Sequence, residues 1–534
     1  MDRQCNDTNR KLVSQQHPHR PIGGALLVLM ALAAGCAAIA SDGLPQRVWG
    51  QPTCAVPVNE RRHKDELRQV SIDDESAATA YNQLVSDHAD RLEDCRRDTW
   101  PQQQAIWLRL YPHDAQPGVL ADVLDRVVNR GYNQVYIEVF YEGRVMLPVA
   151  DNPTVWRSVL EEAVAAGEVD EEYDLWAEAV RQGQARGLDV HGWMFALNFG
   201  WAYGELSDRQ DVLAVNGEGE TSISNAEWDA DEVSDGRAFY SDPSELEHLF
   251  VDPYNDTARA DLVTAVDALL ERDPDGMLFD YIRYPTVYLQ DTLITEPQQL
   301  WIYSPASRQA LLEGLESDRE RSLMETYIDS GTVTEDDVRD SLADRPDEVL
   351  SVEMQHFSVE QQGWADDLTS AELELYQHYF WELATDHAYR GVLEFADEVA
   401  RPVDERDLAV STVFFPQGNQ SEEGGFDARM QPWDRFAPQF ERHPMSYAVC
   451  DDGSCVAEQI QEVVNQSPES RVCPILAGTW GQDFGGHLAL EDQMSVLQSA
   501  LPNLDCVSHF VYAWMEPDSD RDRKAGIGVG EARP

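Results

Sequence analysis

Eight short apolar or β-branched runs alternate with helical patterns along most of the chain, and this alternation constrains the fold more than any other feature. Strands separated by helices are typical of parallel sheets, because two parallel strands need a long crossover connection. The runs are Ala105–Tyr111, Gln134–Phe140, Asp189–Phe199, Gly276–Tyr284, Leu408–Phe415, Arg442–Tyr447, Val472–Trp480 and Cys506–Met515. Helical patterns between them include Val119–Asn129, Tyr173–Arg186, Ala258–Glu271, His387–Val399, Ala457–Asn465 and Leu490–Ala500. Eight such units predict an α/β protein with a (β/α)8, or TIM, barrel rather than an open sheet.

Two long polar stretches interrupt this repeat, each directly after a strand. Residues 201–250 follow the third strand and are acidic and rich in Ser, Gly and Asn, whereas residues 286–380 follow the fourth and are mostly helical. Loops after barrel strands emerge at the C-terminal face, so both stretches are candidates for walls of a substrate groove. The predicted organisation is an export signal or anchor (1–40), a polar linker and N-terminal cap with a helix around Asp73–Cys95 (41–100), the barrel (101–520) and a C-terminal tail (521–534).

The chain is strongly acidic, with 98 Asp and Glu against 40 Lys and Arg, a formal charge of −58. This excludes a nucleic-acid-binding protein that contacts phosphates through a basic face. The only lysines are Lys11, Lys64 and Lys524. An acidic surface with almost no Lys stays hydrated in strong salt, which favours a halophilic protein, with an ordinary acidic exported protein as the alternative.

The N-terminus has the pattern of an export signal, because basic residues precede the apolar run Ile22–Ala40. Within that run, the sequence ending at Cys36 resembles a bacterial lipobox, which implies lipid attachment to Cys36 and hence to a membrane. Two alternatives stay open: cleavage after the A-x-A pattern that ends at Ala40, and an uncleaved anchor, since the run approaches the ~20 residues of a membrane span. Each alternative places the body of the protein outside the cytoplasm.

Six cysteines follow the signal region, and an even number in an exported chain favours disulfide bonds. Proximity in the sequence favours the pairs Cys54–Cys95, Cys450–Cys455 and Cys473–Cys506, although other connectivities stay open. The chain contains neither a CxxC nor an HExxH motif, so we expect no zinc site and no cofactor.

Three carboxylates stand out in the strand runs. Asp280 lies in the middle of an apolar and aromatic run, where burial is costly unless the residue is paired or functional. Arg283, three residues later, is a substrate clamp or, alternatively, the partner in a structural ion pair at the barrel rim. By period-two alternation, Glu138 shares a face with Tyr136 in the second run, and Glu516 follows on the face of the aromatic residues in the eighth.

Aromatic and polar side chains recur where the strands end. Taken singly, each aromatic residue is more often part of the core, but the repeated placement suits carbohydrate, because apolar sugar faces stack on rings while hydroxyls need a few polar partners. The predicted substrate-binding residues are Arg283, Tyr281, Trp193, Asn198, Tyr447, Trp480, Tyr512 and Trp514.

The segment 250–254, the helix that follows it and the motif Asp275–Pro285 resemble the signature of bacterial family 10 glycosylhydrolase-like proteins. Further agreement comes from Val190–Trp193 and from Trp433 ahead of His443–Tyr447. The resemblance covers residues 105–517 and implies a (β/α)8 barrel that hydrolyses carbohydrate at its C-terminal mouth, with Asp280 as a catalytic carboxylate. The long insertion after strand four departs from this pattern, and no unambiguous carboxylate ends strand seven.

Glycoside hydrolysis needs a second carboxylate. The candidates are Glu516, then Glu138, then Asp483. We therefore expect an exported enzyme that acts on a cell-wall or extracellular polysaccharide, more readily neutral or amino-sugar than strongly anionic. The alternative is a non-catalytic, carbohydrate-binding surface barrel. A metal-dependent deacetylase is less well supported, because the histidines of the barrel show no ligand spacing.

Overall fold

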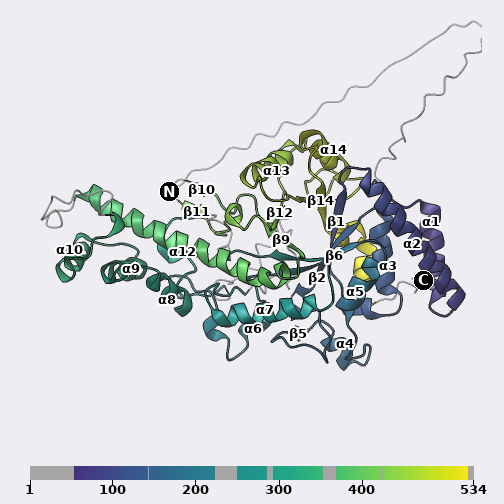
Figure 1. The fold of residues 1–534 in the computed structure, drawn as a ribbon, viewed down its shortest axis with the longest axis horizontal. Helices are drawn as coiled ribbons and strands as arrows, with labels where there is room; N and C mark the ends of the chain where they lie inside the picture. Colours follow the sequence, from purple (N-terminus) through teal and green to yellow (C-terminus); the bar gives the residue numbers. More distant parts are fainter. Residues whose placement is uncertain are drawn as a thin grey trace, which may run out of the picture. The chain divides into compact units, whose positions relative to one another are not determined.

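Eight parallel strands close into a barrel in the computed structural model, which describes residues 53–141, 143–222, 249–285, 293–352, 369–422 and 425–526 (Figure 1). The strand order is β12-β9-β7-β6-β2-β1-β14-β13, so strands that follow one another in the chain are neighbours. Bridges from Arg442 to Val472 and from Met445 to Ile475 join β12 to β13 and complete the ring. The strands are β1 Gln103–Leu108, β2 Gln134–Glu138, β6 Asp189–Phe195, β7 Gly276–Asp280, β9 Ala409–Phe414, β12 Glu441–Pro444, β13 Ile475–Ala477 and β14 Cys506–Phe510. The predicted (β/α)8 barrel is confirmed.

Several strands are shorter than the apolar runs that predicted them. The eighth run was expected to reach Met515, but β14 ends at Phe510 and Tyr512–Met515 forms the short helix α15. The apolar pattern continues past the strand because Tyr512 and Met515 are buried outside the barrel wall. The apolar pattern of the sequence is thus longer than the strand, because residues beyond the last strand hydrogen bonds are also buried.

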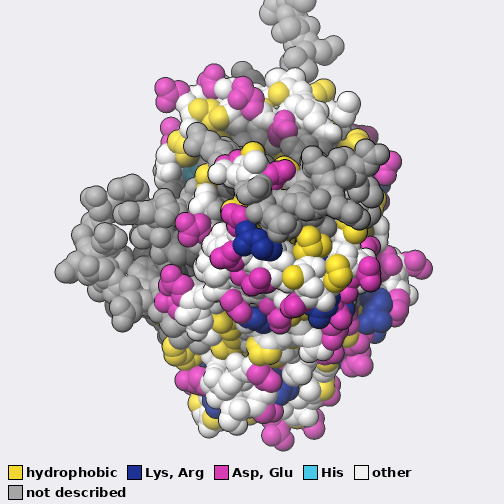
Figure 2. Space-filling model, turned by 90° about the vertical axis from the view of Figure 1, so that its left-hand side faces the viewer, with side chains coloured by type: hydrophobic (Ala, Val, Ile, Leu, Met, Phe, Trp, Pro, Cys, Tyr) yellow, Lys and Arg dark blue, Asp and Glu magenta, His cyan; other side chains and the backbone are white. Residues whose placement is uncertain are grey.

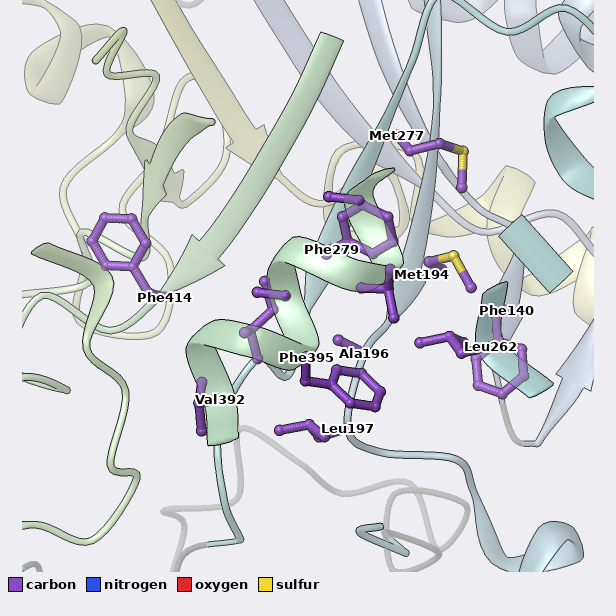
Figure 3. Close-up of a cluster of buried hydrophobic side chains, with 14 of the residues drawn as sticks. Phe140, Met194, Ala196, Leu197, Leu262, Met277, Phe279, Val392, Phe395 and Phe414 are labelled. Carbon is purple, nitrogen blue, oxygen red and sulfur yellow. The ribbon is translucent and has the colours of Figure 1, made fainter. Parts of the chain in front are cut away.

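The main core lies between the outer surface of the strands and the surrounding helices. The helices are α3 Val119–Asn129, α5 Leu175–Gln184, α7 Asp256–Leu270, α12 Ser370–Asp404, α13 Ser454–Gln466, α14 Leu490–Ala500 and α16 Pro517–Lys524. Figure 3 shows side chains of β6 and β7, such as Met194 and Phe279, with Leu262 of α7 and Phe395 of α12. Each such side chain contributes roughly 1.5–3 kcal/mol when fully buried.

Two helices precede the barrel, α1 Val58–Ser71 and α2 Glu75–Arg97, and both pack against α3 (Figure 1). The helix expected around Asp73–Cys95 is α2. The sequence did not predict α1, because its buried positions include charged residues, Lys64 and Arg68, in place of an apolar stripe.

The buried charges of α1 meet carboxylates of α3. Asp125, which is fully buried, accepts a hydrogen bond from Tyr81 at 2.8 Å and forms ion pairs with Lys64 at 3.4 Å and Arg186 at 3.0 Å. Arg68 contacts both Asp125 and Asp122. These contacts, which we call the Asp125 cluster, join the N-terminal helices to the barrel.

Three disulfide bonds connect the cysteine pairs that sequence proximity favoured: Cys54–Cys95, Cys450–Cys455 and Cys473–Cys506. The first ties the segment before α1 to the end of α2. The last connects the segment before β13 to the start of β14.

The insertion after β7 is largely helical, as expected. It contains β8 Leu293–Ile294, α8 Pro305–Glu313, α9 Asp318–Ser330, α10 Glu335–Asp344 and the first part of α12. Strand β8 pairs with β11 (Gly425–Asp427), which pairs with β10 (Ser421–Glu422), so insertions after β7 and β9 share one small sheet. After β6 the chain forms α6 Trp201–Gly204, and after β2 it forms a three-stranded sheet of β3 Phe140–Tyr141, β4 Arg144–Val145 and β5 Arg157–Ser158.

Asp252 fastens the insertion after β7 to the barrel. Its carboxylate is fully buried and accepts hydrogen bonds from the Ser304 hydroxyl at 2.6 Å and the Ser307 amide at 3.0 Å, at the start of α8. Beside it, the Tyr254 ring stacks on His387 of α12 at 4.2 Å. The segment 250–254, part of the family resemblance, therefore has a structural role here.

Acidic side chains are spread over the face that Figure 2 shows, where Lys and Arg side chains are few. Among the helices of the described ranges, none is both long enough and apolar enough to cross a membrane. The predicted export signal, Cys36, and parts of the two insertions and the tail (223–248, 286–292, 353–368 and 527–534) lie outside the described residues.

Replacing Asp125 by Ala is expected to destabilise the fold by about 3–5 kcal/mol, because buried cations of the Asp125 cluster then lose their counter-charge. Urea unfolding followed by circular dichroism measures the change. As a control, Asp90→Ala at an exposed position of α2 should change stability by no more than about 0.5 kcal/mol. Equal stabilities of the two variants would contradict the role given to the cluster.

Candidate active site

Alternate residues of each strand point into the barrel. The inner core consists of Ala105, Trp107, Tyr136, Trp193, Leu278, Val413 and Ile475. By the same alternation, Glu138 of β2, Asp280 of β7 and Arg109 directly after β1 lie on the inward side at or just beyond the C-terminal strand ends. This end of the barrel, which we call the mouth, thus collects two carboxylates and a guanidinium above an aromatic layer.

Asp280 is the last residue of β7 and is partly exposed. Its carboxylate accepts hydrogen bonds from the Tyr281 amide at 2.7 Å and from the Trp193 indole at 3.3 Å. Burial of the carboxylate raises the pKa of Asp280 to about 6, and the negative charge of Glu138 adds to the rise, whereas the Tyr281 amide, Arg283 and Trp193 lower it. Asp280 can therefore be protonated near neutral pH, as a general acid must be.

Tyr281 has a left-handed backbone conformation, with φ of 53°. Such a conformation is costly for a residue with a side chain and is concentrated at functional sites. Here it ends the strand and accompanies the hydrogen bond from the Tyr281 amide to Asp280. The Tyr281 ring packs on Phe195 at 4.6 Å.

Arg283 lies near Asp280 on the side of β9. Its guanidinium covers the Tyr281 ring at 4.8 Å and approaches Phe250 at 5.5 Å and Phe415 at 5.9 Å. It also donates a hydrogen bond to the Tyr284 carbonyl at 3.0 Å. Its positive charge lowers the pKa of Asp280.

Glu138 ends β2 and is buried, and Arg109 binds it through two hydrogen bonds of 2.5 and 3.1 Å. A bidentate guanidinium favours the ionised form of a carboxylate. Arg109 is itself 26% exposed and covers the Tyr141 ring at 4.9 Å. Arg109 therefore holds Glu138 in one position and in its ionised form at one side of the mouth.

Trp193 stands between the two carboxylates. It is the register partner of Glu138 across the β2–β6 pair, and its indole reaches Asp280 of β7. Strands β2 and β7 flank β6, so their backbones are separated by two strand spacings, about 10 Å. Asp280 and Glu138 thus lie on either side of Trp193.

Aromatic side chains extend the mouth from Trp193 toward the last strands. Phe510 contacts Trp193 at 6.3 Å and Trp514 at 5.4 Å, and Trp514 contacts Phe484 at 4.9 Å. Tyr447 also lies beside Phe510, at 6.4 Å. Phe510, Trp514, Phe484 and Tyr447 are partly exposed, so a ligand can reach them.

Three of the predicted substrate-binding residues make hydrogen bonds within the protein. Asn198 is buried and accepts hydrogen bonds from the Gly200 and Leu249 amides. Trp480 donates to the Tyr132 hydroxyl at 3.1 Å, and Tyr512 is buried with its hydroxyl 3.0 Å from that of Ser519. The alternation that placed Tyr512 with Trp514 is wrong, because the strand has already ended at Phe510.

Two candidate second carboxylates have other partners. Glu516 accepts hydrogen bonds from Arg126 of α3 at 3.1 Å and from Arg130, the residue directly after α3, at 2.7 Å. The structure therefore places Glu516 against the helix layer rather than beside Asp280. Asp483 is exposed in the loop after β13, where it accepts a hydrogen bond from the Ala489 amide at 2.9 Å.

Arg109 and Phe484 belong to the mouth but were not predicted. The sequence does contain a signal for Arg109: it is a charged residue in an apolar run, and it lies on the same strand face as Ala105 and Trp107. The sequence contains no comparable signal for Phe484, because its position depends on a turn formed by the two glycines that follow it. Among the described residues, no group of three or more His, Cys, Asp or Glu is arranged to hold a metal ion.

No family model and no curated protein matches the chain, so the resemblance to family 10 glycosylhydrolase-like proteins stays an expectation. Solved structures of similar fold include the glycoside hydrolase domain of PgaB (BpsB) from Bordetella bronchiseptica, 14% identical over 80% of this chain and 99% of that one, with a TM-score of 0.44. The catalytic domain of β-amylase from Paenibacillus polymyxa is 8% identical, with 80% and 95% coverage and a TM-score of 0.42. A GH18 chitinase from Pseudoalteromonas aurantia is 9% identical, with 80% and 100% coverage and a TM-score of 0.32. At this similarity, a functional assignment depends on the site itself.

Glu516→Gln is expected to destabilise the fold by about 1–2 kcal/mol while leaving turnover intact, because the carboxylate binds arginines at α3. Thermal unfolding and reducing-end release measure the two effects. A large loss of turnover at unchanged stability would restore Glu516 as a catalytic candidate.

Proposed function

We propose that this protein is an exported glycoside hydrolase that cleaves glycosidic bonds in a cell-wall or extracellular polysaccharide. The observation that carries the proposal is the position of Asp280: a partly exposed carboxylate at a strand end, with a pKa raised to about 6 and an aromatic surface beside it. Perturbed carboxylates at the C-terminal end of a barrel are characteristic of active sites.

Asp280 and Glu138 take different parts in this reaction. Asp280, protonated below a pH of about 6, donates its proton to the leaving glycosidic oxygen as the bond between that oxygen and the anomeric carbon breaks. A water molecule then forms a bond to the anomeric carbon and returns a proton to the Asp280 carboxylate. Glu138 is buried and bound by Arg109, so it is not free to attack the sugar, and its part is to raise the pKa of Asp280. Glu138 is in this view a positioning residue that tunes Asp280 rather than a nucleophile.

The mouth suits sugar rings. Phe510 and Trp514 are partly exposed and offer apolar surfaces on which sugars stack, and the guanidinium of Arg283 near Asp280 suits sugar hydroxyls. The net charge of −58 favours neutral or amino-sugar polymers over anionic ones unless salt screens the repulsion.

Export is supported by the three disulfide bonds, which persist in oxidising compartments. The signal-like N-terminus adds to this support, and lipid attachment at Cys36 would hold the enzyme at the cell envelope.

Asp280→Asn is expected to lower turnover by at least about 100-fold, because the amide cannot donate the acid's proton. A panel of cell-wall and exopolysaccharide fragments, assayed for new reducing ends at high salt, measures the loss. Thermal unfolding at pH 8 should show equal or higher stability, since the wild-type carboxylate must be ionised there against its burial. Asp492→Asn, at an exposed position of α14, is the control for substitution alone. Full turnover by Asp280→Asn would refute the assignment.

The pH dependence of kcat/KM should respond in opposite directions to two substitutions near Asp280. With a protonated acid required, wild-type activity falls as the pH rises above about 6. Arg283→Gln removes a charge that lowers the pKa of Asp280, so this limb moves to higher pH. Glu138→Gln removes a charge that raises it, so the limb moves to lower pH. Shifts in the same direction would show that Asp280 does not set this limb.

A further inference from the structure

A second group of polar side chains lies inside the barrel, toward the N-terminal ends of the strands. These inward-facing residues, which we call the basal polar layer, are Gln134, Tyr136, His191, Ser411, Glu441 and His443. Tyr136 joins this layer to the aromatic layer above it: its ring contacts Trp107 at 5.0 Å, His191 at 5.6 Å and His443 at 5.4 Å. The basal polar layer is thus separated from Asp280 by the inner aromatic core.

Most of these side chains are more than nine-tenths buried, and Glu441 is the exception at 16% exposed. Seven of their polar atoms have no hydrogen-bond partner within the described ranges: Gln134 Oε1, Tyr136 Oη, His191 Nδ1, Ser411 Oγ, Glu441 Oε2, His443 Nδ1 and His443 Nε2. Buried polar atoms in native proteins are almost always hydrogen-bonded to protein or to ordered water. Seven unpaired atoms in one place would cost a large part of the stability of a folded domain.

Three of these atoms belong to neighbouring groups. His443 Nε2 lies 3.5 Å from Glu441 Oε2, at the upper limit for a hydrogen bond. The Tyr136 ring lies 5.4 Å from the His443 ring, next to this pair. Burial, followed by the charge of Glu441, raises the pKa of the Tyr136 hydroxyl. The other Glu441 oxygen binds Arg471 at 2.8 Å, so the carboxylate is held in place from below.

Small residues adjoin the long side chains of the layer. Ala105 is the register partner of Gln134, and Gly276 is the partner of His191. A Cβ atom at Gly276 would lie 2.7 Å from His191 Nδ1, so only glycine admits the imidazole at this position. Burial lowers the pKa of His191 to about 4, so at pH 7 the ring is neutral and can both donate and accept a hydrogen bond.

We propose that the basal polar layer is a water-binding site, in which one buried water molecule bridges the Tyr136 hydroxyl, the Glu441 carboxylate and the His443 imidazole. Water is the ligand class that fits, because the set combines donors and acceptors with a carboxylate already neutralised by Arg471. The site is independent of the proposed hydrolase activity, which lies on the other side of the aromatic core.

A crystal structure of the full chain at about 1.5 Å resolution tests the proposal. We expect an ordered water within ~2.6–3.2 Å of Tyr136 Oη, Glu441 and His443. A layer in which the seven atoms bond directly to one another, with no solvent density, would overturn the proposal. Crystals soaked in bromide distinguish an anion, and an anomalous peak in the layer would also overturn it.

Tyr136→Phe provides the matched variant. Removal of the hydroxyl should displace the bridging water from its position, whereas Tyr284→Phe, which deletes a buried and unpaired hydroxyl outside the layer, should leave it in place. A water that keeps its position and all its remaining contacts in both variants would show that Tyr136 does not bind it. If Tyr136→Phe fails to fold, the electron density of the wild-type crystals tests the proposal by itself.

Discussion

Closure of the eight-stranded ring is the constraint on which the rest of the structure depends. Once β12 bridges to β13, every strand has two neighbours, and period-two alternation sends half of its side chains into a narrow interior. That interior is filled largely by Trp107, Tyr136 and Trp193, and most polar side chains that the structure describes there lie toward its two ends. The same alternation therefore creates the mouth with Asp280 and the basal polar layer, two sites of different chemistry separated by one aromatic layer.

A chain so poor in cations nevertheless buries several of them. Lys64 and Arg68 pair with carboxylates of α3, while Arg96 and Arg442 are satisfied largely by backbone carbonyls, among them Gly131 and Phe436. Burial lowers the pKa of Arg96 to about 10, and it stays charged at neutral pH. Carboxylates such as Asp122 and Asp125 are buried with these cations, so the excess of negative charge stays at the surface, where salt screening should matter most.

The barrel could be predicted because the hydrophobic residues of its strands and helices recur with the period of each element. Asp280 could be predicted because it is a charged residue within an apolar run. Helix α1 escaped prediction because Lys64 and Arg68 occupy positions where a period would show apolar residues. The predicted positions of Glu516 and Tyr512 were wrong because the apolar pattern of the eighth run continues after the strand has ended at Phe510. The Arg109–Glu138 pair depends on which strands are neighbours, and a single residue pattern does not contain that information.

Two aspartates of the segment that resembles a family signature show why burial alone does not identify a reactive carboxylate. Burial raises the pKa of both Asp252 and Asp280. Asp252 has no exposed surface and receives three donors, from Tyr254, Ser304 and Ser307, so its oxygens are committed to holding α8. Asp280 receives one short hydrogen bond and one of 3.3 Å within the described ranges, and it is partly exposed. A carboxylate has about four acceptor positions. Asp280 thus combines a raised pKa with partial exposure and fewer donors within the described ranges, which suits the proton-donor role proposed for it, whereas Asp252 is an anchor.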